Sequence, residues 1–123
     1  MAEFSLILIP CLLLFFAVMN FTMALYCYDF VGYSAQQAAR YAIVHGATAT
    51  KTVSASDIQT YVDGLVTGIV NTSQLTVNTS WAPNNQPGST VTVTVGYTFN
   101  PLCSFVSTTN ITLSQSAAMV ISQ

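Results

Sequence analysis

The chain has 123 residues, of which 52% are hydrophobic and only 5% are charged, with a formal net charge of −2. An ordinary soluble domain carries about 25% charged residues, so a free monomer of this composition would be poorly soluble. The length allows one small domain beside an anchor, and the lack of a basic patch leaves nucleic-acid binding without an electrostatic basis.

The first element is an apolar segment that begins after a single carboxylate. Glu3 is followed by residues 4–28, which carry no charge, and about 20 such residues are enough to cross a bilayer as a helix. A secretory signal would need a basic start and a small-residue exit site, and neither is present. The first basic residue is Arg40. We therefore expect Met1 to lie at or near a processed N-terminus whose basic leader has been removed.

The helical pattern continues beyond the apolar segment as far as His45. This predicts one helix over about residues 2–45, on the order of 65 Å long, with Gly46 as the left-handed residue that ends it. Pro10 lies inside the helix and can kink it. Residues 1–28, which we call the rod, are apolar all round and need a partner outside this chain to bury them. Residues 29–123 form the predicted head, which includes the two-faced half of the long helix.

A second helix is predicted over about residues 55–70. Ser54 and Asp57 have the spacing of a capping box at its start. Its apolar positions recur with helical spacing at Ile58, Tyr61, Val62, Leu65, Val66, Ile69 and Val70.

From Gln74 onward the hydrophobic residues alternate, which indicates strands. The inward positions are Leu75, Val77 and Trp81, then Val91, Val93, Val95, Tyr97 and Phe99, then Ile111, Leu113, Ala117, Met119 and Ile121. The outward positions are mostly Thr, Ser and Asn, so we expect one face of the sheet to be exposed to solvent and the apolar face to pack against another element. The predicted class is α+β, with a three-stranded antiparallel sheet packed on the C-terminal half of the long helix.

Several segments together resemble the TadE/TadG-like proteins of tight-adherence (Tad) pili, within the type IV pilin superfamily. They are the opening Glu3-Phe4 with its apolar run, the helical stretch over residues 35–42, the strand over residues 91–102 and the closing residues 111–120. The resemblance covers nearly the whole chain. It implies a pilin-like fold and a structural subunit that a prepilin peptidase cleaves and that pilus assembly machinery extracts from the inner membrane into an extracellular filament for surface attachment. The implied partners are copies of the chain itself in a helical homopolymer.

The resemblance also implies that Glu3 and Phe4 set the register between subunits. Pilins of this superfamily are similar in having an acid just after the cleavage point that meets the N-terminal amine of a neighbouring subunit. That acid is usually fifth and here it is third, so either cleavage differs or two residues are missing from the start. The alternative is that Glu3 only favours the positive end of the helix dipole.

The remaining candidate sites are few. In an exported chain Cys27 and Cys103 could form a disulfide, within or between subunits, or remain buried free thiols. Asn71, Asn78 and Asn110 begin Asn-x-Ser/Thr triplets and are possible glycosylation sites. His45 is the only histidine, and Asp57 and Asp63 do not share a helix face, so we expect no catalytic group, no metal and no cofactor.

Three functions stay open at this point. The first is a filament-forming pilin. The second is a minor pilin or membrane-anchored assembly protein. The third is an anchored surface adhesin that binds through the loop at residues 81–89 or the loop at residues 102–106.

Overall fold

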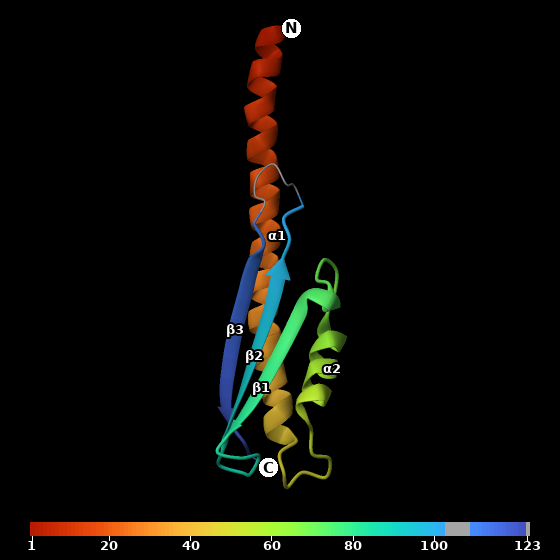
Figure 1. Ribbon diagram of the computed structural model, residues 1–123, viewed down its shortest axis with the longest axis vertical. Coiled ribbons are helices and arrows are strands. Elements are labelled where there is room, and N and C mark those ends of the chain that lie inside the picture. Colours follow the sequence, from red (N-terminus) through yellow and green to blue (C-terminus); the bar gives the residue numbers. More distant parts are fainter. Residues whose placement is uncertain (103–108, 123) are drawn as a thin grey trace.

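The computed structural model describes residues 1–102 and 109–122. It contains two helices, α1 (Ala2–Val44) and α2 (Ala55–Leu65), a short 3-10 turn, η1 (Thr72–Gln74), and three strands, β1 (Leu75–Ala82), β2 (Thr90–Phe99) and β3 (Ile111–Val120). Figure 1 shows the N-terminal half of α1 standing clear of the rest, while its C-terminal half lies behind the sheet with α2 beside it. The predicted α+β class and the order of its elements are confirmed.

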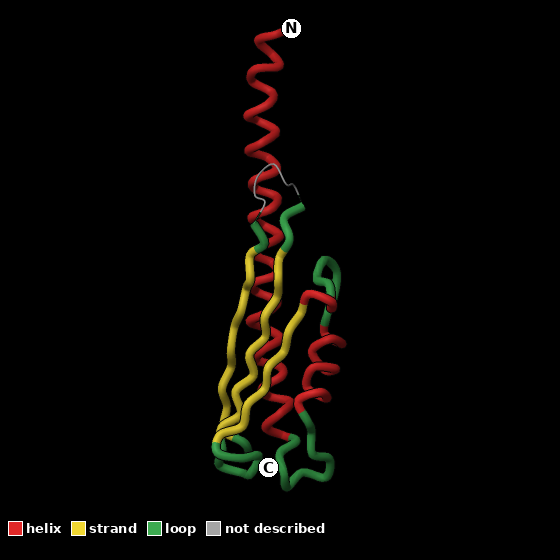
Figure 2. The backbone as a smooth tube through the Cα atoms, viewed as in Figure 1, coloured by secondary structure: helices red, strands yellow, loops and turns green. Residues whose placement is uncertain are grey.

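The three strands form an antiparallel meander in the order β1-β2-β3. Leu75 pairs with Tyr97 at one end of the first ladder, and Phe99 pairs with Ile111 at one end of the second. Figure 2 shows the connections between the elements gathered at the two ends of the sheet. α1 packs on β2 and β3, and α2 packs on β1, so the two helices together cover one face of the sheet.

Small side chains on α1 let the helix lie close to the sheet. The buried face of its second half carries Ser34, Ala35, Ala38, Ala39 and Ala42, all less than 2% exposed. Opposite them the central strand buries Val91, Val93 and Val95 completely. The valines stand at every second position, as the alternating pattern predicts. This contact between helix and strand is the core of the head.

The outward face of the sheet carries hydroxyl and amide side chains. They are Thr76, Asn78 and Ser80 on β1, Thr92, Thr94 and Thr98 on β2, and Thr112, Ser114 and Ser116 on β3. No Asp, Glu, Lys or Arg occurs after Asp63 in the sequence. The sheet therefore has one apolar face and one uncharged polar face.

Two helix ends differ from the prediction. α2 stops at Leu65 because Val66 has an extended backbone (φ −63°, ψ 127°) and Gly68 has a positive φ of 70°. The predicted residues 66–70 are therefore a connection, in which Ile69 is 52% exposed and Val70 is buried. The prediction that Gly46 ends α1 in a left-handed conformation is also wrong. Positive φ angles among the described glycines occur only at Gly68 and Gly88, and α1 ends through His45, whose N–H donates to the carbonyl of Ala42 at 3.2 Å.

Candidate functional site: the rod and its base

The N-terminal part of α1 exposes most of its apolar side chains. Phe4 is 69% exposed, Leu6 is 76% exposed and Leu14 is 69% exposed. The other large apolar residues of α1 up to residue 19 with more than a third of their surface exposed are Ile7, Leu8, Ile9, Leu12, Leu13, Phe15, Val18 and Met19. α1 is the one helix in the described residues that is long and apolar enough to cross a membrane. An apolar surface this large on a single chain marks a site of contact with lipid or protein.

Glu3 and Phe4 lie together in the first turn of α1, where both are exposed. The free backbone N–H groups of a first turn favour a carboxylate at this position. The hydroxyl of Ser5 donates to the carbonyl of Met1 at 3.3 Å, one turn earlier. Pro10 lies inside α1, and the helix continues unbroken through it. The end of the rod thus presents one carboxylate next to an otherwise apolar surface.

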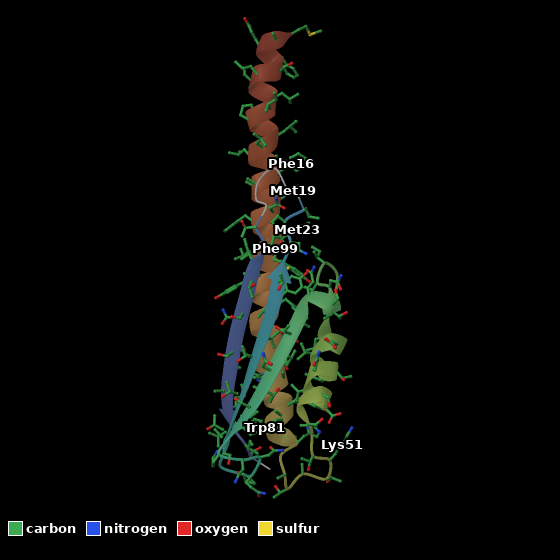
Figure 3. The ribbon with its side chains drawn as sticks, in the orientation of Figure 1. Phe16, Met19, Met23, Lys51, Trp81 and Phe99 are labelled. Carbon is green, nitrogen blue, oxygen red and sulfur yellow. The ribbon has the colours of Figure 1, made fainter. Side chains whose placement is uncertain are left out.

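The base of the rod, residues 17–28, packs against the head along one side and is exposed along the other. Cys27 is fully buried, and Met23 and Ala24 are half-buried against the core. Figure 3 shows Met19, Met23 and Phe99 at this level, where the strands end beside α1, whereas Trp81 and Lys51 lie at the far end of the head. The base therefore connects the exposed rod to the core through buried side chains.

Two hollows open on opposite sides of this base. The larger, about 340 Å³, is almost entirely apolar and is lined by Val18, Met19, Thr22, Met23, Tyr26 and Ile69. The smaller, about 190 Å³, is lined by Ala17, Asn20, Phe21, Ala24, Phe99, Pro101 and Ile111. Ile111 was predicted to face inward, and it is 44% exposed because it borders this hollow.

A third hollow of about 300 Å³ continues the first one toward the head. Tyr26 borders both, and the third is lined also by Asp29, Phe30, Tyr33, Leu65 and Thr67. α2 ends at Leu65, and the extended chain after it stays beside α1, where the hydroxyl of Tyr26 donates to the carbonyl of Thr67 at 3.4 Å. Leu65 and Thr67 therefore form the wall of this hollow that faces α1. We call the first and third hollows together the long groove. It is apolar near the rod and carries one carboxylate, that of Asp29, near the head.

Asn20 is a polar residue whose role the sequence did not reveal. It is 8% exposed, and its Oδ1 accepts a hydrogen bond from the backbone N–H of Leu102 at 3.1 Å, 82 residues away. Its Nδ2 is buried and has no partner among the described residues. The sequence feature that could have pointed to it is that Asn20 is the one amide side chain between residues 4 and 28. It ties the connection after β2 to the rod.

The cysteines and the Asn-x-Ser/Thr triplets do not form a common site. Cys27 is a buried free thiol and Cys11 is an exposed one on the rod. Cys103, its proposed disulfide partner, lies outside the described residues. Asn71 precedes η1 and its Oδ1 accepts from the backbone N–H of Ser73 at 3.0 Å. Asn78 and Asn110 are exposed, on the outward face of the sheet and just before β3 respectively.

The capping box at the start of α2 is confirmed. The backbone N–H and the hydroxyl of Ser54 donate to Oδ2 of Asp57 at 2.9 and 2.8 Å. These hydrogen bonds, and to a lesser extent the positive charge of Lys51, hold the pKa of Asp57 below its usual value of 3.8. The pair caps the N-terminus of α2 and stabilises that helix end.

His45 makes its contacts at the end of its own helix. His45 places its Nδ1 2.8 Å from the carbonyl oxygen of Tyr41, as a residue at a helix end does. No group of three or more His, Cys, Asp or Glu side chains that could hold a metal occurs in the residues that the structure describes. The candidate functional surface is therefore the rod, together with the long groove and the smaller hollow at its base. No protein-family model, no curated protein and no solved structure matches this chain.

Proposed function

We propose that this chain is the structural subunit of an extracellular pilus-like filament of the Tad type, held in the inner membrane before assembly and used for surface attachment. The observation that carries the proposal is the free-standing N-terminal part of α1, whose residues 4–15 are exposed and have no cover among the described residues, while the second half of the same helix packs into the core of the head. Lipid can cover such a rod before assembly, and the rods of neighbouring copies can cover it afterwards.

The energetic gain from covering the rod is large. Burying ten Leu, Ile or Phe side chains at about 1.5–3 kcal/mol each contributes on the order of 15–30 kcal/mol before the entropy of association is subtracted. A contact that joins the rod of one copy to a different surface of the next does not close on itself, so repetition gives an open helical fibre. The same rod in a monomer would remain in the membrane.

Filaments sheared from cells that express this chain test the proposal. We expect them to consist mostly of this chain and to begin at a defined mature N-terminus when electron microscopy and N-terminal sequencing are applied to one preparation. Recovery of the chain from membranes alone, with no filaments, would contradict it.

A second candidate function is a membrane-anchored assembly protein or minor pilin. The same exposed rod favours it, since α1 is long enough to span a bilayer by itself. Stoichiometry separates the two functions, because a minor subunit would be found only in trace amounts in filaments made of another protein. For the adhesin alternative, the loop at residues 81–89 is described, whereas residues 103–106 of the second loop lie outside the described residues. Replacing both loops should abolish adhesion and leave filaments intact if the chain is an adhesin, whereas lost filaments would indicate a role in assembly.

A further inference from the structure

The surface of α1 that faces away from the sheet carries two opposite charges. Asp29 and Arg40 are both exposed, and neither has a hydrogen bond or an ion pair among the described residues. They are eleven residues apart, close to three helical turns of 3.6 residues, so they project from the same side of the helix. Tyr33 and Gln36 lie between them on that side and are also exposed.

This side of α1 is opposite the core. The buried positions of the second half, including Val31, Ala35 and Ala38, face β2 and β3, which leaves the side of Asp29 and Arg40 uncovered. In a filament whose heads point outward, this side faces the filament axis. A charge buried there without a partner costs several kcal/mol, so the two charges must be paired.

Within one subunit the two charges cannot meet, because three turns separate them by about 16 Å along the helix. They can meet between two parallel copies if one copy is displaced by that distance along the other. Asp29 of the displaced copy then lies level with Arg40 of its neighbour.

The same displacement matches the rod to the long groove. Five residues of α1 line the apolar end of the groove: Val18, Met19, Thr22, Met23 and Tyr26. The residues eleven positions earlier are Ile7, Leu8, Cys11, Leu12 and Phe15. All five are exposed on the rod, and none is charged. A single offset of eleven residues therefore pairs the two charges and also covers the apolar surfaces.

We propose that a second copy of this chain docks on the back of α1 with a stagger of three helical turns, so that its Asp29 pairs with Arg40 and its residues 7–15 cover the apolar end of the long groove. This inference rests on the proposed filament and adds the register of one of its contacts. The pair uses side chains of the head half of α1 and is independent of Glu3.

Charge reversal in the full-length chain tests the pair. Asp29→Arg or Arg40→Asp alone places like charges opposite each other, and we expect the fraction of chain in sedimentable filaments to fall at least about 10-fold. An equal mixture of the two variants restores an opposite charge at every contact of an alternating fibre, so the filaments should return. Lys51→Asp changes a charge in the exposed connection after α1 and should assemble as the unmodified chain does.

Crosslinking measures the stagger directly. With Cys103 replaced by Ser, a cysteine in place of Thr22 should join the native Cys11 of the next copy in assembled filaments through a short bifunctional maleimide, giving a ladder of oligomers. Cys11→Ser should abolish the ladder. Val44 is also exposed on this side of α1, but it lies far along the helix from the level that Cys11 of the next copy reaches. Val44→Cys should therefore give no ladder of crosslinked oligomers.

The outcomes separate the two proposals. If the unmodified chain forms no filaments, both the proposed function and this contact are wrong. If it forms filaments and both single charge reversals assemble equally well, or if the mixture fails to recover, the Asp29–Arg40 contact is wrong and the filament stands. If filaments form but Thr22→Cys gives no crosslink, the second copy does not lie in the long groove and the proposed contact is wrong. That result would indicate lipid as the occupant of the groove.

Discussion

Tyr41 of α1 and Tyr61 of α2 stack with their ring centroids 4.4 Å apart and their planes only 5° from parallel. The ring of His45 lies 4.4 Å from the Tyr41 ring on the same helix. α2 is only 11 residues long and buries Ile58 and Val62 as its two fully enclosed side chains. The tyrosine stack therefore adds a contact between α1 and α2 to the apolar contacts that these two side chains make.

Replacing Tyr61 by Ala should lower the free energy of unfolding by about 1–3 kcal/mol, since stacking adds to the apolar area that the ring buries. Denaturant unfolding of the full chain in detergent, followed by near-UV circular dichroism, measures the change. Tyr33→Ala removes an exposed tyrosine that has no ring partner among the described residues, and it should cost less than about 0.5 kcal/mol. Equal losses from both variants would show that the stack contributes nothing specific.

Glu3→Ala should leave the head folded and reduce assembly. The proposed reason is that an ionised carboxylate among apolar rods needs a partner, and pairing selects one stagger over others. The measurement compares the sedimentable fraction with the unfolding curve of the same preparation. Ser5→Ala is the matched control, because its hydroxyl bonds only the carbonyl one turn earlier. Normal filament yield from Glu3→Ala would remove the role in register and leave the helix-dipole alternative.

Gly96 on β2 is a position where an added side chain would force a neighbour to move. A Cβ added there would lie 2.7 Å from Oγ1 of Thr76 on the neighbouring strand. We expect Gly96→Ala to cost about 1–3 kcal/mol in unfolding free energy, and Thr76→Ala in the same chain to recover most of it. Gly64→Ala is the control. A Cβ there meets nothing within 4 Å, and alanine in a helix should stabilise by up to about 1 kcal/mol.

Asn20→Ala should loosen the connection after β2 without unfolding the head. It removes the acceptor of the Leu102 N–H, and a hydrogen bond of this kind contributes about 1 kcal/mol. Hydrogen exchange at the Leu102 amide should then become about fivefold faster. Thr22→Ala removes a hydroxyl that bonds only the carbonyl of Val18 within α1, so exchange at Leu102 should not change. An unchanged rate in Asn20→Ala would show that the contact does not hold the connection.

The capping box predicts a pH dependence. The pKa of Asp57 is lowered in the folded chain, so its contribution to stability is fully present above the unfolded value of 3.8 and is lost as the pH falls through the lower folded value. Thermal unfolding between about pH 5 and pH 2 should therefore show a steeper loss of stability for the native chain than for Asp57→Asn. If stability falls equally with pH in the native chain and in Asp57→Asn, the lowered pKa of Asp57 does not contribute to stability.

The regular parts of the fold could be predicted because their signals are local. The apolar period of α1, the Ser54–Asp57 spacing and the alternation of Val91, Val93 and Val95 each depend on residues close in sequence, and the structure confirms them. The end of α2 was missed because Val66 and Ile69 continue the helical period, although the backbone at Val66 is already extended.

The surfaces around the rod could not be predicted, since they are made by residues distant in sequence. Asn20 meets Leu102 only because the end of β2 returns to the base of the rod. Ile69 reaches the long groove only because α2 stops four residues earlier. The charges at Asp29 and Arg40 were visible in the sequence, but their shared exposure could be assigned only when the buried side of α1 was known.

The outward face of the sheet has a consequence for how the molecule responds to its surroundings. Its hydroxyl and amide side chains carry no charge, and no Asp, Glu, Lys or Arg side chain follows Asp63. Dissolved salt weakens interactions between charges and has little effect on neutral hydrogen-bonding groups. Contacts made through this face will therefore keep nearly the same strength in dilute and in saline water.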